Sequence, residues 1–392
     1  MKNFSWPMLV LLAFVISACS AGKTNDKKAN WSVKMAEAAM SRFDSLIYYN
    51  NPSKVKWQYD IAMVGHAIDK LGNQNQKFSA YMQGFYDYFI NEEGQIKVYK
   101  LEDYNLDNVN PAKGLITLYK RTGEEKYHTA IETIVRQLEG QPETSVGGFW
   151  HKKRYPSQMW LDGIYMASPF MAQYAKEFNQ PCWFDTAAHQ IKVIYKKTLD
   201  PATGLLYHAN DESRDQRWSD PETGNSPHFW GRAIGWYMMA LVDVLEYFPA
   251  DHPGRKDLVK IFNEVSAALM KVRDPEAKLW YQVLDQGQRE GNYLEASCSN
   301  MFIYAFAKGA KKGYLPDKYH NYAQESFKAV LDNFIKEDSD GHITLTNTCG
   351  AAGLGGDPYR DGSYEYYVNE IVVENDPKGV GPFILAAIEL DY

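Results

Sequence analysis

Residues 155–169 read YPSQMWLDGIYMASP, and this stretch places one acid, Asp162, among large apolar side chains. Because desolvation disfavours the charged form of a carboxyl group, Asp162 should hold its proton more tightly than it would in water. Such an acid suits general acid catalysis near neutral pH. An isolated aspartate of this kind is more often a helix cap or the partner of a buried base, so the rest of the chain has to decide.

On both sides of this stretch, the chain alternates pairs of helices with short breaks. The pattern of apolar residues predicts helices over 31–49, 57–72, 76–91, 108–122, 124–139, 168–179, 182–198, 228–248, 254–273, 293–312, 316–336 and 380–390. Five similar breaks, each a turn followed by a few β-prone residues, start at Gly94, Gly148, Gly204, Lys278 and Gly341. A helix–hairpin unit that recurs in this way indicates an internal repeat.

The repeat predicts an all-α fold. About six helix pairs favour an (α/α)6 barrel, in which inner helices are ringed by outer ones. An open helical solenoid is the alternative, but the repeat units are long and their loops are rich in aromatic residues. In the barrel, the short strands and loops would meet at one mouth and line the site. We expect one catalytic domain over residues 31–392.

The N-terminal segment predicts export. Residues 8–16 form an apolar run that is too short to span a bilayer and has the length of a signal-peptide core. Small residues before Cys19 resemble a bacterial lipobox, so we expect a signal peptide over 1–18, lipidation of Cys19 and a polar tether over 19–30. The protein would then lie in the periplasm or cell envelope, with the lipid as its only membrane contact. Ordinary cleavage nearby, which gives a soluble periplasmic protein, is the alternative.

Composition narrows the choice of partner. The 28 Tyr and 10 Trp residues suit carbohydrate, because aromatic rings stack on sugar faces, although a tyrosine-rich core would give the same counts. A net charge of -7 argues against a nucleic-acid partner. After Cys19, three cysteines remain, Cys182, Cys298 and Cys349, without the spacing of a disulfide framework or a zinc site. We expect buried free thiols, with one distant disulfide as the alternative.

A second acid, Asp107, follows the preceding break in a position similar to that of Asp162. Equivalent positions of adjacent repeats lie side by side in a repeat barrel, so we expect the two carboxylates to face each other at one mouth. Two acids at close range do not both ionise easily, and one of them keeps its proton. The alternative role for Asp107 is an N-cap on the next helix.

A third segment, SPHFWGRAIGW at 226–236, places Arg232 and Trp236 four residues apart on one helical face. An arginine fork beside a tryptophan plane suits a sugar ring that bears a carboxylate. An internal pair between Arg232 and a buried acid is the alternative.

Further polar groups lie at the ends of two breaks. His208 follows one β-prone break, and His151 and Lys152 follow another. Each is weak alone, but together with the arginine they suggest a locally basic mouth and an anionic sugar. The Gly-rich stretch 349–367 is expected to fold over this mouth, with a plain surface loop as the alternative.

Four segments together resemble glycoside hydrolase family 105, the unsaturated rhamnogalacturonyl and uronyl hydrolases, and less closely the unsaturated glucuronyl hydrolases of family 88. They read MWLDGIYMASPFMAQYA, SPHFWGRAIGWYMMALVDVLEYFP, NYLEASCSNMFIYAFAKG and GLGGDPYRDGSYEYYVNE. The likeness runs from about Trp57 to the C-terminus. It implies an (α/α)6 barrel, in agreement with the repeats.

The resemblance also implies a reaction. The substrate would be a terminal 4,5-unsaturated uronic acid left by a polysaccharide lyase, most directly an unsaturated galacturonic acid from rhamnogalacturonan or another pectic oligosaccharide. Asp162 would protonate C4 and then deprotonate the water that attacks C5, and Asp107 would position the sugar and hold the proton on Asp162. The implied substrate-binding residues are His208, Arg232, Trp236, Trp160 and Trp230. No metal or other cofactor is implied, and the role of His151 and Lys152 is left open.

Two other functions stay open from the sequence. One is another barrel enzyme acting on uronic acids, a glycosidase or a lyase, and a lyase would more often carry a Tyr/His or Arg base–acid set. The other is a surface lipoprotein that only binds glycan, which would not need Asp162. We expect a monomer or weak oligomer, and the sugar that follows the uronic acid is not specified.

Overall fold

The computed structural model describes residues 1–3, 30–49 and 55–392, so the predicted lipidation site Cys19 lies outside the described residues. The longer helices are α1 (Trp31–Arg42), α2 (Tyr59–Asp69), α3 (Gln76–Phe89), α4 (Ala112–Thr122), α5 (Glu125–Glu139), α6 (Leu161–Glu177), α7 (Cys182–Thr198), α8 (Gly231–Tyr247), α9 (Pro253–Lys271), α10 (Ala296–Lys311), α11 (Lys318–Phe334) and α13 (Pro377–Glu389). The short elements are the helix α12 (Tyr364–Asn369), the 3-10 helices η1 (Leu46–Tyr48), η2 (Leu101–Asp103) and η3 (Leu106–Asn108), and the strands β1 (Gln158–Trp160), β2 (Ala209–Asp211), β3 (Ile335–Glu337), β4 (Ile343–Leu345), β5 (Thr348–Cys349) and β6 (Val372–Val373).

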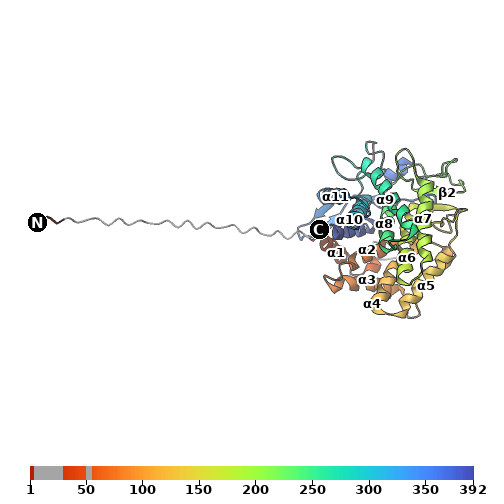
Figure 1. Ribbon diagram of the computed structural model, residues 1–392, viewed down its shortest axis with the longest axis horizontal. Helices are drawn as coiled ribbons and strands as arrows, with labels where there is room; N and C mark the ends of the chain where they lie inside the picture. Colours follow the sequence, from red (N-terminus) through yellow and green to blue (C-terminus); the bar gives the residue numbers. More distant parts are fainter. Residues whose placement is uncertain (4–29, 50–54) are drawn as a thin grey trace.

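The long helices form two concentric rings (Figure 1). Within the inner ring, α13 packs against α2 and α10, α10 packs against α8, α8 against α6, and α6 against α4. A small cavity of about 40 Å³ is lined by side chains from all six of these helices, which shows that the ring is closed. The outer helices α3, α5, α7, α9 and α11 pack against inner helices, and α1 packs against α13. The predicted (α/α)6 barrel is therefore confirmed, and the open solenoid is wrong.

The two rings differ in how their sequences are buried. The inner helix α8 buries 14 of its 17 residues, because it contacts other helices on nearly every side. The outer helix α9 buries 7 of its 19 residues, on one stripe, and turns its charged side chains to solvent. A helix that is apolar all round belongs in a core, and an amphipathic helix belongs on a surface. The pattern thus assigns α8 to the inner ring and α9 to the outer ring.

The breaks between outer and inner helices share one backbone feature. Each turns at a residue with positive φ: Gly94 at 74°, Gly147 at 76°, Gly204 at 79°, Lys278 at 59° and Gly341 at 82°. Glycine adopts this left-handed conformation without the clash that a Cβ atom causes, so Lys278 is the strained member of the set. The recurrence of the turn confirms the internal repeat.

Three two-stranded antiparallel sheets lie in the loops between the helices, pairing β1 with β2, β3 with β4, and β5 with β6. The register of the first pair places Trp160 opposite Ala209. This pairing joins the hairpin before α6 to the hairpin before α8, and so brings two of the predicted site segments together.

Helix α6 begins earlier than the sequence suggested. The expected start was residue 168, but the helix starts at Leu161 and runs through Pro169. Proline has no N–H to donate to the carbonyl one turn earlier. That carbonyl, on Tyr165, instead accepts a hydrogen bond from the side-chain amide of Asn110 at 3.1 Å. A side chain from the neighbouring repeat thus replaces the hydrogen bond that proline cannot make. Because α6 starts at Leu161, Asp162 lies in its first turn.

The two ends of the barrel meet. The backbone N–H of Ser32, at the start of α1, donates to the carbonyl of Tyr392 at 3.2 Å, and Figure 1 shows the C-terminus beside α1. No helix among the described residues has both the length and the apolar composition needed to cross a membrane.

Candidate active site

Backbone hydrogen bonds join the loops that carry the predicted site residues. The N–H of Leu106 donates to the carbonyl of His151 at 3.1 Å, and the N–H of His151 donates to the carbonyl of Gln158 at 2.8 Å. The N–H of Leu161 donates in turn to the carbonyl of His208 at 3.0 Å. Three successive hairpins are thereby held in one row. The loops of adjacent repeats therefore lie side by side, and the face-to-face placement of the Asp107 and Asp162 carboxylates stays a prediction.

Asp162 faces an imidazole. Its Oδ2 lies 3.2 Å from Nε2 of His208, whose side chain is fully buried, while 14% of the Asp162 side chain is exposed. The acid can therefore be reached from solvent on one side while a buried base holds it on the other. The next residue, Gly163, leaves room for a second imidazole, because a Cβ atom there would lie 3.0 Å from Nδ1 of His151.

Asp107 has a different environment. Its carboxylate contacts the ammonium group of Lys152 and lies 3.4 Å from Nε2 of His151. Burial alone would raise the pKa of Asp107, but Lys152 and His151 hold that pKa below its ordinary value. Asp107 is therefore ionised near neutral pH. Burial lowers the pKa of His151 to about 4, so this imidazole is neutral there.

The alternative role of Asp107 as a helix cap is wrong. Helix α4 begins at Ala112 and its N-cap position is Pro111, with no side-chain cap. The carboxylates of Asp107 and Asp162 have separate partners, an ammonium for the first and the imidazole of His208 for the second.

Aromatic rings enclose this cluster. Trp160 lies between two rings, with His151 at 4.8 Å and 9° on one side and Tyr155 at 5.1 Å and 10° on the other. The edge of Trp160 meets His208 at 5.3 Å, and Trp230 lies 4.8 Å from the same imidazole. Both tryptophans are thus placed beside the acid, where the sequence predicted walls.

Arg232 and Trp236 are enclosed by protein. Only 1% of the Arg232 side chain is exposed, and its guanidinium lies 3.4 Å from Glu295. It also donates to Oγ of Ser297 at 2.7 Å and contacts the carbonyl of Cys349. These contacts match the alternative of an internal arginine–acid pair.

Trp236 has no exposed surface and stacks on Tyr165 at 5.0 Å. The edge of a further ring, Tyr59, meets Trp236 at 5.7 Å. A contact of Trp236 or Arg232 with substrate stays a prediction.

The Gly-rich stretch packs on the site. We call residues 350–363 the strap. Its Leu354 forms a buried apolar cluster with Trp160, Ala209 and Trp218. Arg360 of the strap donates to the hydroxyl of Tyr155 at 3.3 Å. The expectation that this loop covers the mouth, and is more than a plain surface loop, is confirmed.

Sequence reasoning missed one polar residue of this cluster, Tyr367 of α12. Its hydroxyl lies 2.8 Å from Nδ1 of His208, across 159 residues of chain. A tyrosine in a tyrosine-rich segment carries no local signal that would single it out. The three cysteines among the described residues are free thiols, buried at Cys298 and Cys349 and exposed at Cys182.

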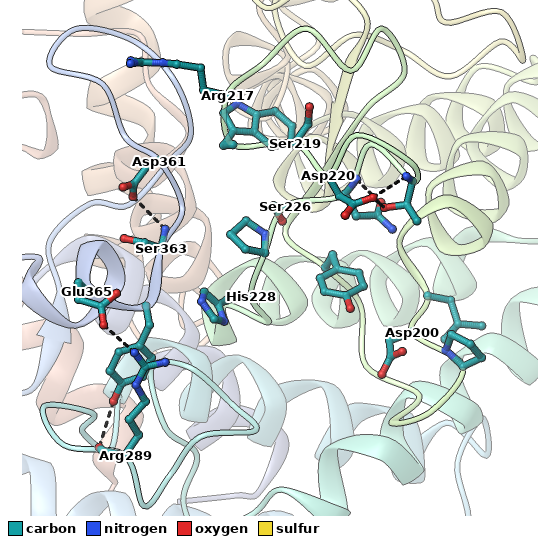
Figure 2. Close-up of a pocket in the computed structure, with 18 residues that line it drawn as sticks. Asp200, Arg217, Ser219, Asp220, Ser226, His228, Arg289, Asp361, Ser363 and Glu365 are labelled. Carbon is teal, nitrogen blue, oxygen red and sulfur yellow. Dashed lines mark hydrogen bonds and ion pairs between the residues drawn. The ribbon is translucent and has the colours of Figure 1, made fainter.

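A groove of about 630 Å³ lies next to the cluster (Figure 2). It shares a wall with the cluster through Ser226, whose hydroxyl accepts a hydrogen bond from the N–H of Ala209. Its charged side chains are already engaged: Arg289 pairs with Glu365 at 2.6 Å, and Asp361 accepts from the N–H of Ser363. Neither Asp162 nor Asp107 lines it. The groove and the aspartate cluster are therefore separate features of this mouth.

Comparisons with known proteins agree with this geometry. The family model described as glycosyl hydrolase family 88 matches residues 31–391. A solved structure of a family 105 glycoside hydrolase from C. acetobutylicum ATCC 824 is 46% identical, with a TM-score of 0.89 over 92% of this chain and 99% of that chain. The unsaturated rhamnogalacturonyl hydrolase YesR of Bacillus subtilis (strain 168) is 25% identical over 315 residues, which are 79% of this chain and 84% of that protein. An unsaturated glucuronyl hydrolase from Bacillus sp. GL1, at 13% identity and a TM-score of 0.64 over 92% and 95% of the two chains, shares the fold.

Proposed function

The chain belongs to glycosyl hydrolase family 88, together with its family 105 relatives, and we propose from this premise that it removes a terminal 4,5-unsaturated uronic acid by adding water across the C4=C5 bond. The observation that carries the proposal is the pairing of Asp162 with His208 at one mouth of the barrel, beside an ionised Asp107. One partly exposed acid against a buried imidazole suits proton transfer to carbon.

The reaction begins with transfer of a proton from the carboxyl group of Asp162 to C4. The positive charge that develops at C5 is shared with the ring oxygen and is stabilised by the nearby ionised carboxylates. Water attacks C5 and gives its proton back to Asp162. The resulting hemiketal opens, the bond from C1 to the glycosidic oxygen breaks, and the remaining sugar leaves.

The residues around Asp107 would hold the sugar. A hydroxyl group can donate to the Asp107 carboxylate, and the ammonium of Lys152 can pair with the substrate carboxylate, because both side chains are partly exposed at 17% and 13%. Trp160 is stacked between His151 and Tyr155, so it would bound the sugar with its edge and not with a ring face.

For the substrate, we propose an unsaturated galacturonic acid from rhamnogalacturonan or another pectic oligosaccharide. The support is the likeness to the unsaturated rhamnogalacturonyl hydrolase of Bacillus subtilis. Two further relatives, at 25% and 20% identity, are unsaturated 3S-rhamnoglycuronyl hydrolases, so lyase products of other uronate polymers belong in the same test.

The test follows the ultraviolet absorbance of the conjugated double bond. Purified protein is incubated with unsaturated oligosaccharides made by lyases from pectin, from ulvan and from glycosaminoglycan. Loss of absorbance on the pectin products alone supports both the reaction and the substrate. Loss on another set supports the reaction and overturns the substrate. Binding without any loss of absorbance would favour the glycan-binding lipoprotein.

A matched pair of variants then locates the chemistry. His228→Ala, which changes the wall of the neighbouring groove in Figure 2, should keep turnover within about threefold of the wild type. His208→Ala should lower kcat by at least about a hundredfold, because the partner of the acid is lost. The opposite ranking would move the reaction to the groove.

A further inference from the structure

Tyr367 completes a buried chain of three polar groups. Its hydroxyl lies 2.8 Å from Nδ1 of His208, and Nε2 of the same ring lies 3.2 Å from Oδ2 of Asp162. The side chains of Tyr367 and His208 have no exposed surface. Because water does not reach either side chain, each nitrogen of the ring depends on its one protein partner.

The position of the Tyr367 hydroxyl is fixed by packing. The ring of Tyr367 stacks against Trp230 at 5.8 Å. The carbonyl of Tyr367 accepts from Nε2 of Gln282 at 3.0 Å, and Oε1 of Gln282 accepts from Nε1 of Trp230 at 3.1 Å. Contacts among Tyr367, Gln282 and Trp230 thus fix the position of the Tyr367 hydroxyl beside the imidazole of His208.

The chemistry of Tyr367 and His208 determines which atom carries each proton. Burial raises the pKa of Tyr367 well above its ordinary value, so the phenol keeps its proton. Nδ1 of His208 is the one hydrogen-bond partner that the described structure gives this buried hydroxyl, so the hydroxyl donates to it. Nδ1 of His208 is then the acceptor, and a neutral imidazole with Nδ1 as acceptor carries its proton on Nε2. Nε2 is the ring nitrogen that lies 3.2 Å from Oδ2 of Asp162.

We propose that Tyr367 is a positioning residue for the acid. By keeping the proton of His208 on Nε2, it makes Oδ2 of Asp162 a hydrogen-bond acceptor and leaves Oδ1 as the oxygen that carries the proton for C4. This inference rests on the proposed function, since it assigns a proton that only the hydration reaction uses.

The opposite tautomer of His208, with the proton on Nδ1, would turn the carboxyl proton of Asp162 away from the substrate. With a bare Nε2, the carboxyl proton of Asp162 would lie on Oδ2 and point at the imidazole, away from the sugar. The other titratable groups near this chain are His151, Asp107 and Lys152 on the adjacent hairpins, and Tyr366, Cys349 and Arg360 beside Tyr367. The neutral His151 and the Asp107–Lys152 pair do not change charge near neutral pH, so the tautomer of His208 is set by the tyrosine.

The first experiment measures the pH profile of Tyr367→Phe, which removes the hydroxyl and keeps the ring. We expect kcat to fall by about tenfold or more while KM stays within about threefold. We also expect the basic limb of kcat/KM to move to higher pH, because a carboxylate that loses a hydrogen-bond donor holds its proton more tightly. A fall in kcat with an unmoved limb, or no fall at all, overturns the proposal.

A control and a double variant separate positioning from general damage. Tyr237→Phe removes another buried hydroxyl, which donates to the carbonyl of Ile191 at 3.0 Å, and should keep both kcat and the limb. In a His208→Ala background, Tyr367→Phe should change kcat by less than about twofold, because its route to the acid is gone. A full further loss in that background overturns the proposal.

A measurement on the unmodified enzyme covers the case in which Tyr367→Phe does not fold. Nitrogen-15 NMR of the 9 histidines, with His208 identified by its loss in His208→Ala, reports which ring nitrogen bears the proton. We expect a protonated Nε2. A protonated Nδ1 overturns the proposal even if the enzyme is active, whereas a wild type inactive on every lyase product overturns the proposed function and leaves the tautomer measurable.

Discussion

The two aspartates of the cluster have different nearest neighbours. Asp162 faces the buried imidazole of His208 across 3.2 Å, and Asp107 is paired with the ammonium of Lys152. The ammonium of Lys152 keeps Asp107 charged, and Asp162 has no such cation among its contacts.

The first prediction concerns Asp162→Asn. An amide has almost the same shape but no proton to deliver, so kcat should fall by at least about a hundredfold. The Kd for an unsaturated disaccharide should stay within about threefold, measured by calorimetry. Retention of most of the activity would show that another group protonates C4.

The second prediction concerns pH. Because Lys152 and His151 hold the pKa of Asp107 below its ordinary value, Asp107 stays ionised, and the wild type should remain active, into mildly acidic solution. In Lys152→Met the ammonium is lost and burial dominates, so the pKa of Asp107 rises and the acidic limb of kcat/KM should move to higher pH. An acidic limb that stays in place would show that Asp107 is not needed in its charged form.

At the residue scale, the sequence predicted which residues belong to the cluster better than it predicted which residues contact one another. Asp162, Asp107 and His208 were predicted from their places after similar breaks, and the structure brings them together. Arg232 was predicted to contact the substrate. Its ion-pair partner Glu295 lies 63 residues further along the chain, and no sequence pattern links the two residues. Tyr367 is further still, and its role depends on a contact that only the folded chain creates.

At the scale of elements, the sequence predicted the repeat correctly but predicted some helix boundaries incorrectly. The start of α6 was misplaced because Pro169 looks like a helix start, although a side chain from the neighbouring repeat satisfies the carbonyl that proline leaves open. Helix α12, only six residues long, was missed because such a segment has too few turns to show a period.

The third prediction uses the turns between the rings. Lys278 adopts a φ of 59° where the equivalent turns have glycine, so Lys278→Gly should raise the free energy of unfolding by about 0.5 kcal/mol. Gly204→Ala, at a φ of 79°, should lower it by about 1 kcal/mol, since the new Cβ would also lie 3.1 Å from the Cβ of Ala268. Urea unfolding measures both, and the same sign for the two changes would contradict the turn equivalence.

At the scale of the whole molecule, one ion cluster ties the inner ring together. Lys308 on α10 pairs with Asp243 at 2.6 Å and Glu246 at 2.7 Å on α8, and 3% of the lysine side chain is exposed. Burial alone would raise the pKa of Asp243, but Lys308 holds that pKa below its ordinary value. The pair therefore stabilises the fold above the ordinary carboxyl range, and this contribution is lost as pH falls through the lowered pKa.

The fourth prediction follows from that cluster. Lys308→Met should lower the free energy of unfolding at pH 7 by about 3–5 kcal/mol, because the buried carboxylate of Asp243 loses its ion-pair partner. The difference from the wild type should shrink as the pH falls, because the pairing of Asp243 that acid removes from the wild type is already gone in the variant. Urea unfolding at pH 7 and at low pH, followed by circular dichroism, measures this. Lys311→Met, on the same helix but 48% exposed, should change stability by less than about 0.5 kcal/mol. Equal effects of the two changes would show that the buried pair adds nothing.

The fifth prediction concerns Cys19, which lies outside the described residues. Cys19→Ser should release the protein from the membrane fraction of cells into the soluble fraction and abolish incorporation of labelled palmitate. Membrane association that survives this change would show that the attachment does not use Cys19.

The meeting of Ser32 with Tyr392 sets a condition on the order of events in the cell. A ribosome makes α1 and α2 first and α13 last, yet α13 packs against both of them to close the ring. The first helices must therefore wait, with their apolar faces uncovered, until the final helix has been synthesised. A chain of independent helical hairpins could fold as it emerges, but this ring closes only once α13 has left the ribosome.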